Sequence, residues 1–280
     1  MRIINTDIIT KNIKEMCIEA NYKLASDVES RVRSAEEMET SILGKQILSQ
    51  LSENLDIAAA EDIPICQDTG MAIVFLKLGQ QVQLEGVFLE EAINEGIRQG
   101  YAEGYLRKSV VGDPLIRRNT GDNTPGIIHY EMIPGDRIEI TVAPKGFGSE
   151  NMSRVYMLKP SDGVEGVKQA VLETVRLAGP NACPPIVVGV GIGGSFEKCT
   201  LLSKKALARS MNQPSPLEHI RKLEEELLTE INSLGIGPGG LGGRMTALGV
   251  NIETYPTHIA GLPVAINICC HVNRHVSREL

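Results

Sequence analysis

The sequence predicts a single α+β domain, in which a helical N-terminal part precedes a mixed or antiparallel sheet flanked by helices. Apolar residues recur at helical spacing through the first 60 residues. Farther along, short apolar runs end at clusters of Gly, Pro, Asn and Asp, a pattern typical of strands. No internal repeat or linker divides residues 1–280, and a chain of 280 residues can bury a substantial core. We therefore expect one domain over residues 1–280.

The predicted helices are recognised by apolar residues three or four positions apart. In the first helix this apolar face includes Cys17, which we interpret as a buried packing thiol. Cys199 stands at the start of a later helix and is interpreted in the same way. Helices beyond residue 60 are expected over Leu89–Tyr101, Gly163–Leu177, Lys198–Arg209 and Pro216–Ser233.

The predicted strands are short apolar runs bounded by turn residues. A strand over Met71–Leu78 follows Pro64, where the helical part ends. A β-hairpin is expected from Ile127–Ile133 and Arg137–Val142, joined by the turn Pro-Gly-Asp. Two buried strands are expected at Ile186–Val190 and Val264–Ile268.

The composition excludes several classes of partner. The chain carries a formal net charge of −7 and no basic run, which argues against binding nucleic acid or an anionic membrane surface. The N-terminus lacks the apolar core of a signal peptide, and no stretch approaches the roughly 20 apolar residues of a membrane span. We expect a cytoplasmic protein, in which six cysteines serve metal binding or catalysis more often than disulfides.

Three cysteines stand in turn-like contexts far apart in the chain. Cys66 lies in PICQDTG, Cys183 in NACPP and Cys270 in NICCHVNRH, separated by 117 and 87 residues. Three converging thiolates suit a [4Fe–4S] cluster with one iron free of protein ligands, and such an iron can act as a Lewis acid. Cys269 and Cys270 are neighbours on a strand and point to opposite faces, so only one of them can be a ligand.

Two residues near these motifs are candidates for proton transfer. Asp68 follows Cys66 by two residues, where an Asp is either a turn residue or a proton donor and acceptor. His258 lies between two prolines in TYPTHIAGLP and is either a structural residue or a proton partner of a carboxylic acid such as Asp68.

The cationic candidates for substrate binding are Arg107, Arg117, Arg118, Lys145 and Arg274. Arg107 and Lys145 are favoured over the others, which are more simply read as solvated, because both flank turn-forming segments. An Arg fork can hold a carboxylate at two points. The Gly-rich segments GVGIGG and GGLGGR are expected to form tight loops around a compact anion or cluster. Dinucleotide binding by GVGIGG is disfavoured, because the sequence shows no second parallel strand and acidic residue at the required spacing.

Taken together, nine motifs resemble the class I fumarate hydratase and L-tartrate dehydratase family, and specifically the α subunit of its two-subunit type. The resemblance runs from about residue 10 to the end, with the motifs in family order. They are PICQDTG, YLRKSVVGDPL, NTGDNTPG, PKGFGSENMS, NACPP, GVGIGGSFEK, GLGGRMTALGV, THIAG and CHVNRH.

The resemblance implies a [4Fe–4S] cluster held by Cys66, Cys183 and Cys270, since the family's third motif is a Cys followed by an aromatic residue or His and then Arg. It implies that Asp68 and His258 handle protons. The implied contacts to substrate are Gln67, Arg107, Lys145, Gly146 and Gly148, although Phe147 stands where fused relatives often have Gly.

The implied function is the reversible hydration of fumarate to (S)-malate, a reaction of small dicarboxylates. In single-chain relatives the rest of the site lies on a β region that follows the matched segment. The resemblance therefore implies a separate β subunit, in an α2β2 assembly. L-tartrate dehydration is the alternative within the family. Outside it stand a zinc-binding protein and an iron–sulfur redox sensor, which iron and sulfide analysis would distinguish.

Overall fold

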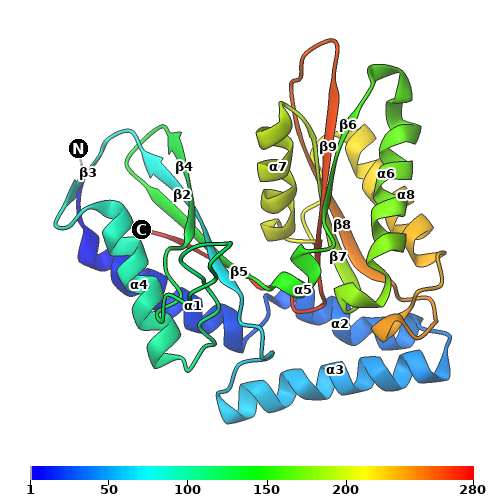
Figure 1. Ribbon diagram of the computed structural model, residues 1–280, viewed down its shortest axis with the longest axis horizontal. Helices are drawn as coiled ribbons and strands as arrows, with labels where there is room; N and C mark the ends of the chain where they lie inside the picture. Colours follow the sequence, from blue (N-terminus) through cyan, green and yellow to red (C-terminus); the bar gives the residue numbers. More distant parts are fainter. Residues whose placement is uncertain (1) are drawn as a thin grey trace. The chain divides into compact units, whose positions relative to one another are not determined.

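A computed structural model describes residues 2–280 and confirms the α+β class (Figure 1). The chain divides into two compact units. Unit 1 comprises residues 2–25, 55–147 and 274–280, and unit 2 comprises residues 26–54 and 148–273. The expectation that residues 1–280 form one domain stays a prediction.

Unit 1 combines helices from the N-terminal part with strands from the middle and the end of the chain. Its helices are α1 (Thr6–Tyr22), α4 (Leu89–Glu103) and the end of α3 (Ile42–Glu61). Its strands are β1 (Arg2–Asn5), β2 (Met71–Gly79), β3 (Val82–Glu85), β4 (Ile127–Ile133), β5 (Ile138–Lys145) and β10 (Val276–Glu279).

The main sheet of unit 1 has the order β10–β5–β2–β4, and β1 pairs separately with β3. The predicted hairpin is therefore wrong: β4 and β5 are strands, but they do not pair with each other. β2 lies between them, parallel to β4 and antiparallel to β5. β2 is almost wholly buried, so pairing on both edges satisfies its backbone groups, and the short β4–β5 turn crosses its end.

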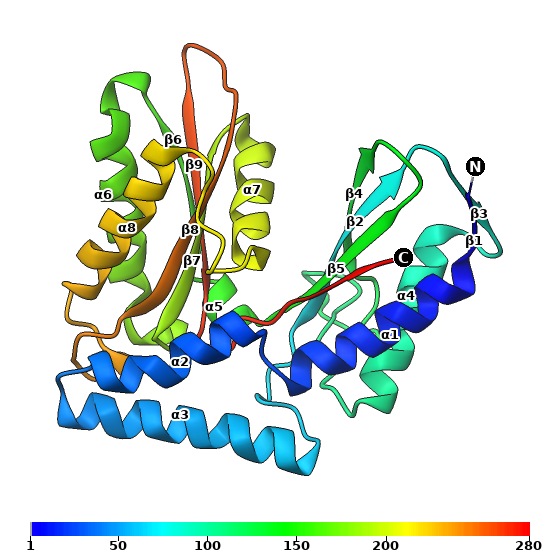
Figure 2. The same ribbon diagram turned by 180° about the vertical axis from the view of Figure 1, so that it is seen from behind.

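Helices α1 and α4 pack against one another and cover one face of this sheet (Figures 1 and 2). The apolar residues that face them alternate along β2 and β5, as the two-residue period of a strand requires. Cys17 lies fully buried in this core, as its place on the apolar face of α1 predicted.

Unit 2 is a sheet with helices on both faces. Its helices are α2 (Ser26–Met38), the start of α3, α5 (Phe147–Glu150), α6 (Gly163–Ala178), α7 (Phe196–Ala208) and α8 (Glu218–Asn232). Its strands are β6 (Arg154–Leu158), β7 (Ile186–Gly193), β8 (Ala247–Tyr255) and β9 (Leu262–Cys269), in the order β6–β9–β7–β8. Both views show α7 on one face, and α6 and α8 on the other (Figures 1 and 2).

Strand β8 was not recognised in the sequence, because it follows the Gly-rich segment without a turn signal of its own. It runs parallel to β7, and the crossover between them contains α7 and α8. Gly189 and Gly191 of GVGIGG lie on β7, where they allow α7 to approach. A Cβ on Gly191 would stand 2.0 Å from the Cys199 carbonyl oxygen, and one on Gly189 would stand 2.3 Å from that of Ser203. This motif therefore serves helix–strand packing, and the expected anion loop is not formed by these two glycines.

The second Gly-rich segment does enclose a compact anion, and that anion is the side chain of Glu39. The Glu39 carboxylate accepts hydrogen bonds from the backbone N–H groups of Thr40, Ser41, Arg244 and Met245 at 2.7–2.9 Å. Glu39 is 2% exposed. Burial opposes ionisation of this carboxyl, but the backbone donors outweigh it and lower its pKa.

Candidate active site

The turn that carries Cys66 is fixed by buried groups of unit 1. The Ile65 N–H donates to the Asn21 carbonyl oxygen at the end of α1 (2.9 Å). Arg274, which precedes β10, donates from Nη2 to the Asp68 carbonyl oxygen (2.7 Å). The buried Tyr101 hydroxyl lies 2.9 Å from the Thr69 carbonyl oxygen, and burial raises its pKa. Groups of unit 1 therefore hold the backbone of the turn from both sides of Cys66.

The Asp68 carboxylate is oriented by two backbone donors. Oδ1 accepts from the Gly70 N–H at 3.1 Å, and Oδ2 accepts from the Phe147 N–H at 2.9 Å. A Cβ on Gly146 would stand 2.9 Å from Oδ2, so only glycine leaves the carboxylate its present place. The structure thus brings the predicted proton-transfer residue to the predicted substrate loop.

Arg107 and Lys145 are both held near this turn, each by different hydrogen bonds. The Thr69 hydroxyl accepts from the Arg107 N–H (2.9 Å) and donates to the Arg107 carbonyl oxygen (3.2 Å). Lys145 is 4% exposed, and its Nζ donates to the Gly146 carbonyl oxygen at 2.9 Å. Gln67 places Oε1 3.4 Å from the Cys66 sulfur. All the predicted site residues of unit 1 therefore gather around residues 65–70.

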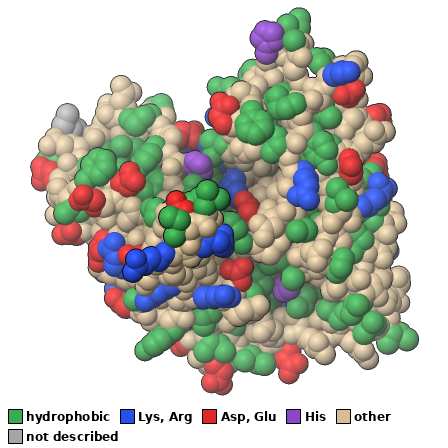
Figure 3. Space-filling view, in the orientation of Figure 1, with side chains coloured by type: hydrophobic (Ala, Val, Ile, Leu, Met, Phe, Trp, Pro, Cys, Tyr) green, Lys and Arg blue, Asp and Glu red, His purple; other side chains and the backbone are tan. Residues whose placement is uncertain are grey.

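The loop between α4 and β4 supplies positive charge beside this turn. Asn123 anchors the loop: it is fully buried, and its Nδ2 donates to the Gly70 carbonyl oxygen (3.2 Å). Figure 3 shows Lys and Arg side chains gathered over the part of unit 1 that contains this loop. Its exposed cations are Arg107, Lys108, Arg117 and Arg118. They can attract an anionic substrate to a chain that is acidic overall.

Cys183 and Cys270 lie on neighbouring segments of unit 2. Cys183 follows a short 3₁₀ turn and precedes β7, in a left-handed conformation with φ 53°. Cys270 follows β9 directly, and β9 pairs with β7. His271 Nδ1 lies 3.1 Å from the Cys183 carbonyl oxygen, which ties the two segments together. Two of the three predicted ligands are therefore brought to one end of the unit 2 sheet.

The six thiols separate into two groups that fit the predicted cluster. Cys66, Cys183 and Cys270 are exposed or partly exposed, whereas Cys17, Cys199 and Cys269 are buried. Burial raises the pKa of Cys17 to about 12 and also raises that of Cys199, so neither readily forms the thiolate that binds iron. Within residues 2–280, none of the six cysteines forms a disulfide.

The predicted ligands are shared between the two units: Cys66 belongs to unit 1, and the other two belong to unit 2. Within residues 2–280, the structure contains no group of three or more Cys, His, Asp or Glu side chains that could hold a metal ion. The donor set itself fits an iron–sulfur cluster, because thiolates are the ligands that such clusters use.

His258 stands apart from the two cysteines of its own unit. It lies on the exposed turn between β8 and β9, where Nδ1 accepts from the Ala260 N–H at 3.2 Å. The eight residues of β9, about 26 Å of extended chain, separate this turn from Cys270. Its pairing with Asp68, a residue of unit 1, stays a prediction. Gly148, in α5, has open space where a Cβ would stand, so no steric requirement for glycine exists there.

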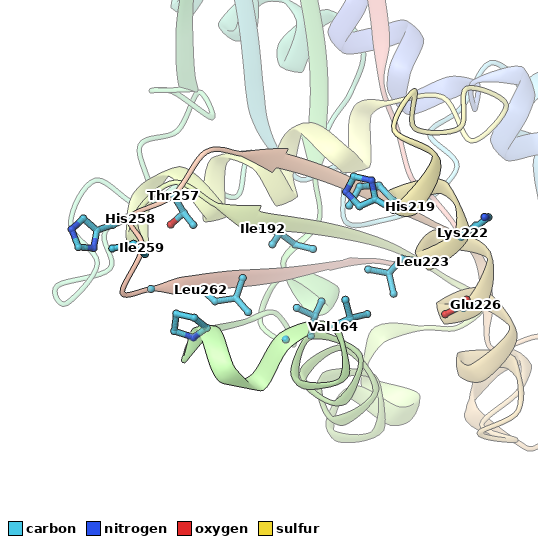
Figure 4. A pocket seen from close by; sticks show the side chains of 15 residues that line it. Val164, Ile192, His219, Lys222, Leu223, Glu226, Thr257, His258, Ile259 and Leu262 are labelled. Carbon is cyan, nitrogen blue, oxygen red and sulfur yellow. The ribbon is translucent and has the colours of Figure 1, made fainter.

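The turn of His258 borders a cavity of about 630 Å³ in unit 2 (Figure 4). Its walls are mainly apolar side chains of α6, α8 and the sheet, among them Val164, Leu223 and Leu262. Glu226 also lines the cavity, but it forms an ion pair with Lys168 at 2.6 Å. His219, Lys222, Thr257 and His258 are its other polar lining residues, so the cavity is bordered by polar groups but walled mainly by apolar ones.

Comparisons with known proteins place this chain among the hydro-lyases. A sequence model of the family described as fumarate hydratase (Fumerase) matches residues 10–279. The chain belongs to this family.

Two relatives illustrate the match. A Methanocaldococcus jannaschii protein, named provisionally as L(+)-tartrate dehydratase subunit alpha, is 44% identical over 278 residues, which cover 97% of each chain. The L(+)-tartrate dehydratase subunit alpha of Escherichia coli (strain K12) is 32% identical over 270 residues, 95% of this chain and 88% of the relative. Within residues 2–280, every helix is too short or too polar to cross a membrane.

Proposed function

We propose that this chain is the α subunit of an iron–sulfur hydro-lyase that interconverts fumarate and (S)-malate. The observation that carries the proposal is the convergence of Asp68, Gly146 and Arg107 on the Cys66 turn, in a chain of the fumarate hydratase family. A carboxylate for proton transfer, a cation and a cluster ligand are the parts that a dicarboxylate hydro-lyase needs.

Cys66, Cys183 and Cys270 would hold the [4Fe–4S] cluster in this proposal. Support comes from their exposure, from the burial of the other three thiols, and from the contact that joins the Cys183 and Cys270 segments. When bound, the cluster supplies an open iron that acts as a Lewis acid toward the substrate.

The chain's own residues bind the dicarboxylate and transfer a proton. The Arg107 guanidinium, on an exposed loop with a fixed backbone, pairs with a substrate carboxylate, and the Gln67 amide adds a neutral hydrogen bond. Asp68 exchanges a proton with substrate through Oδ1 or Oδ2, both already oriented by backbone N–H groups. Lys145 holds the Gly146 carbonyl, which fixes the loop beside that carboxylate.

A separate β subunit would complete the active site, in an α2β2 enzyme. The support is that the relatives, which match over nearly their whole length, are named as alpha subunits. We propose that the β subunit supplies the second proton-transfer group and further contacts to the substrate. A cytoplasmic location belongs to the same proposal, because the thiolate ligands of an iron–sulfur cluster suit a reducing compartment.

L-tartrate dehydration to oxaloacetate is the second candidate function. It is favoured by the names of the relatives, which are L(+)-tartrate dehydratase subunits. The reaction is the same elimination of water on a substrate with one more hydroxyl. Turnover of fumarate, malate and L-tartrate by one preparation of the αβ enzyme would decide between the two, through the ratio of the kcat/KM values.

Anaerobic co-purification with the β subunit tests the proposal as a whole. We expect a brown protein with about four irons and four sulfides per αβ pair, as one [4Fe–4S] cluster requires, and with fumarate hydration that depends on both subunits. A colourless preparation that holds zinc, or one with iron but no hydratase or dehydratase activity, would contradict it. Replacing Cys199 with Ser serves as a control, because this buried thiol should not affect the iron content.

The enzyme is expected to lose activity in air, because no protein ligand retains the open iron of a three-cysteine cluster. Fe²⁺ and a thiol added under argon should restore part of the activity. The measurement is fumarate hydration and iron content during timed aeration. Full activity after prolonged aeration would exclude an open-iron site.

A further inference from the structure

We propose that Asn21 and Arg274 form a clamp that positions the Cys66–Asp68 turn. Both are positioning residues in unit 1: they hold the backbone on either side of the turn without contacting substrate. The role of the clamp in turnover rests on the proposed function, whereas its effect on the Cys66 thiol does not.

The clamp binds the turn through two hydrogen bonds. Before Cys66, the Ile65 N–H donates to the Asn21 carbonyl oxygen at 2.9 Å. After it, Arg274 Nη2 donates to the Asp68 carbonyl oxygen at 2.7 Å. Arg274 Nη1 also donates to Asn21 Oδ1 at 2.7 Å, so the two residues of the clamp are bonded to each other. Cys66 and Gln67 therefore lie between two backbone groups, at residues 65 and 68, that are held by residues bonded to each other.

The burial of Asn21 and Arg274 indicates that their hydrogen bonds position the turn. Asn21 is fully buried, and its Nδ2 donates to the Cys17 carbonyl oxygen one turn earlier in α1 (2.9 Å). Arg274 is 3% exposed, and its hydrogen bonds go to an amide oxygen and a backbone carbonyl. Its Nε is buried without a hydrogen-bond partner among residues 2–280. Burying a guanidinium against neutral oxygens is costly, so packing alone does not explain this side chain.

Arg274 and the Asp68 carboxylate both approach Gly146. Arg274 Nη2 and Asp68 Oδ2 stand 3.4 Å and 2.9 Å from the point that a Cβ on Gly146 would occupy. The other anchors nearby, Tyr101 and Thr69, act on residues 69 and 70 or on Arg107. Asn21 and Arg274 instead bind the backbone at residues 65 and 68, on the two sides of Cys66 and Gln67.

The test is the alkylation rate of Cys66 in the full-length chain, freed of metal and kept reduced. Iodoacetamide is added, and each thiol is followed by peptide mass spectrometry. We expect Arg274→Gln to raise the Cys66 rate about tenfold, because the turn opens more often once its second anchor is lost. Cys183, an exposed thiol of unit 2, is the reference within the same chain and should change less than about twofold.

Arg278→Gln is the matched control. Arg278 belongs to the same C-terminal segment and unit, and it pairs with Glu15 at 2.6 Å and Glu19 at 2.7 Å, away from the turn. Its loss should leave the Cys66 rate at the wild-type value. Arg274→Lys provides a milder variant if Arg274→Gln does not fold. The single lysine amine can reach either Asn21 Oδ1 or the Asp68 carbonyl oxygen, but not both. We therefore expect a Cys66 alkylation rate between those of wild type and Arg274→Gln.

In the αβ enzyme, Arg274→Lys should lower kcat more than it changes KM, since it displaces Asp68 while Arg107 remains. Two results would overturn the clamp: an unchanged Cys66 rate in both Arg274 variants, or Cys66 and Cys183 rates that rise together with a lower melting temperature. The second result would make Arg274 a general stabilising residue. A wild-type αβ enzyme without hydratase or dehydratase activity would refute the proposed function and leave the alkylation result standing.

Discussion

Replacing Asp68 with Asn is expected to lower the turnover of the αβ enzyme about 10²–10⁴-fold, the usual contribution of a general acid or base. The amide occupies the same space, and its oxygen can still accept from one of the two backbone donors, Gly70 or Phe147. The loss should therefore appear in kcat, with iron content close to wild type. Steady-state fumarate hydration and iron analysis of the same sample measure both quantities.

Asp113→Asn is the matched control for this experiment. Asp113 is another turn aspartate of unit 1, and its Oδ1 accepts from the Leu115 and Ile116 N–H groups. Its side chain is exposed, so the same change of charge should leave turnover within a few-fold of wild type. If Asp68→Asn behaves like Asp113→Asn, Asp68 has no part in proton transfer.

Replacing Glu39 with Gln is expected to lower the free energy of unfolding by about 3 kcal/mol, because buried backbone donors lose a carboxylate acceptor. Both oxygens of Glu39 accept, so the amide NH₂ of Gln would face an N–H group of residues 40–41 or 244–245. Urea unfolding of the full chain measures the change. Glu37→Gln is the control: Glu37 is exposed on the preceding helix, and its change should stay within about 0.5 kcal/mol.

The effect of Glu39 should also depend on pH. Its folded-state pKa is lowered, so its stabilising contribution is complete above the ordinary value of 4.5 and is lost as pH falls below that value. The difference in stability between wild type and Glu39→Gln should therefore shrink in acid. A difference that stays constant from pH 7 to pH 3 would show that the carboxylate charge is not what the loop requires.

The loop that Glu39 organises also supports a predicted cluster ligand. The Gly239 N–H donates to the Pro184 carbonyl oxygen at 2.8 Å, next to Cys183. A Cβ on Gly240 would stand 2.4 Å from the Pro180 side chain, so the Gly-rich segment packs directly on the turn before Cys183. Loss of Glu39 should therefore disturb the Cys183 turn first.

Local patterns in the sequence predicted most of the helices and the burial of Cys17 and Cys199. Cys17 sits on the apolar face of a periodic helix, and the structure buries it completely. Cys66, Cys183 and Cys270 stand in turns, and the structure leaves all three at least partly accessible. The burial of Cys17 was predictable because an apolar face is a property of neighbouring residues, whereas the role of the three accessible cysteines as cluster ligands stays a prediction.

Pairing between distant segments was not predictable in the same way. The turn between β4 and β5 carries an ordinary hairpin signal, yet β2 separates the two strands, because β2 is buried and needs a neighbour on each edge. The role of GVGIGG likewise depends on α7, whose backbone lies against Gly189 and Gly191. The spacing of residues in the β4–β5 turn does not reveal β2, and the spacing of glycines in GVGIGG does not reveal α7.

The sequence by itself determined the α+β class, the turn-like contexts of Cys66, Cys183 and Cys270, and the resemblance that names the predicted residues of the site. Only the tertiary structure decided that Asn21 and Arg274 hold the Cys66 turn, that Glu39 fills the Gly-rich loop, and that His258 lies at the other end of the sheet from Cys270. The physical reason is that buried hydrogen bonds form between groups up to 253 residues apart, for which a sequence holds no local signal.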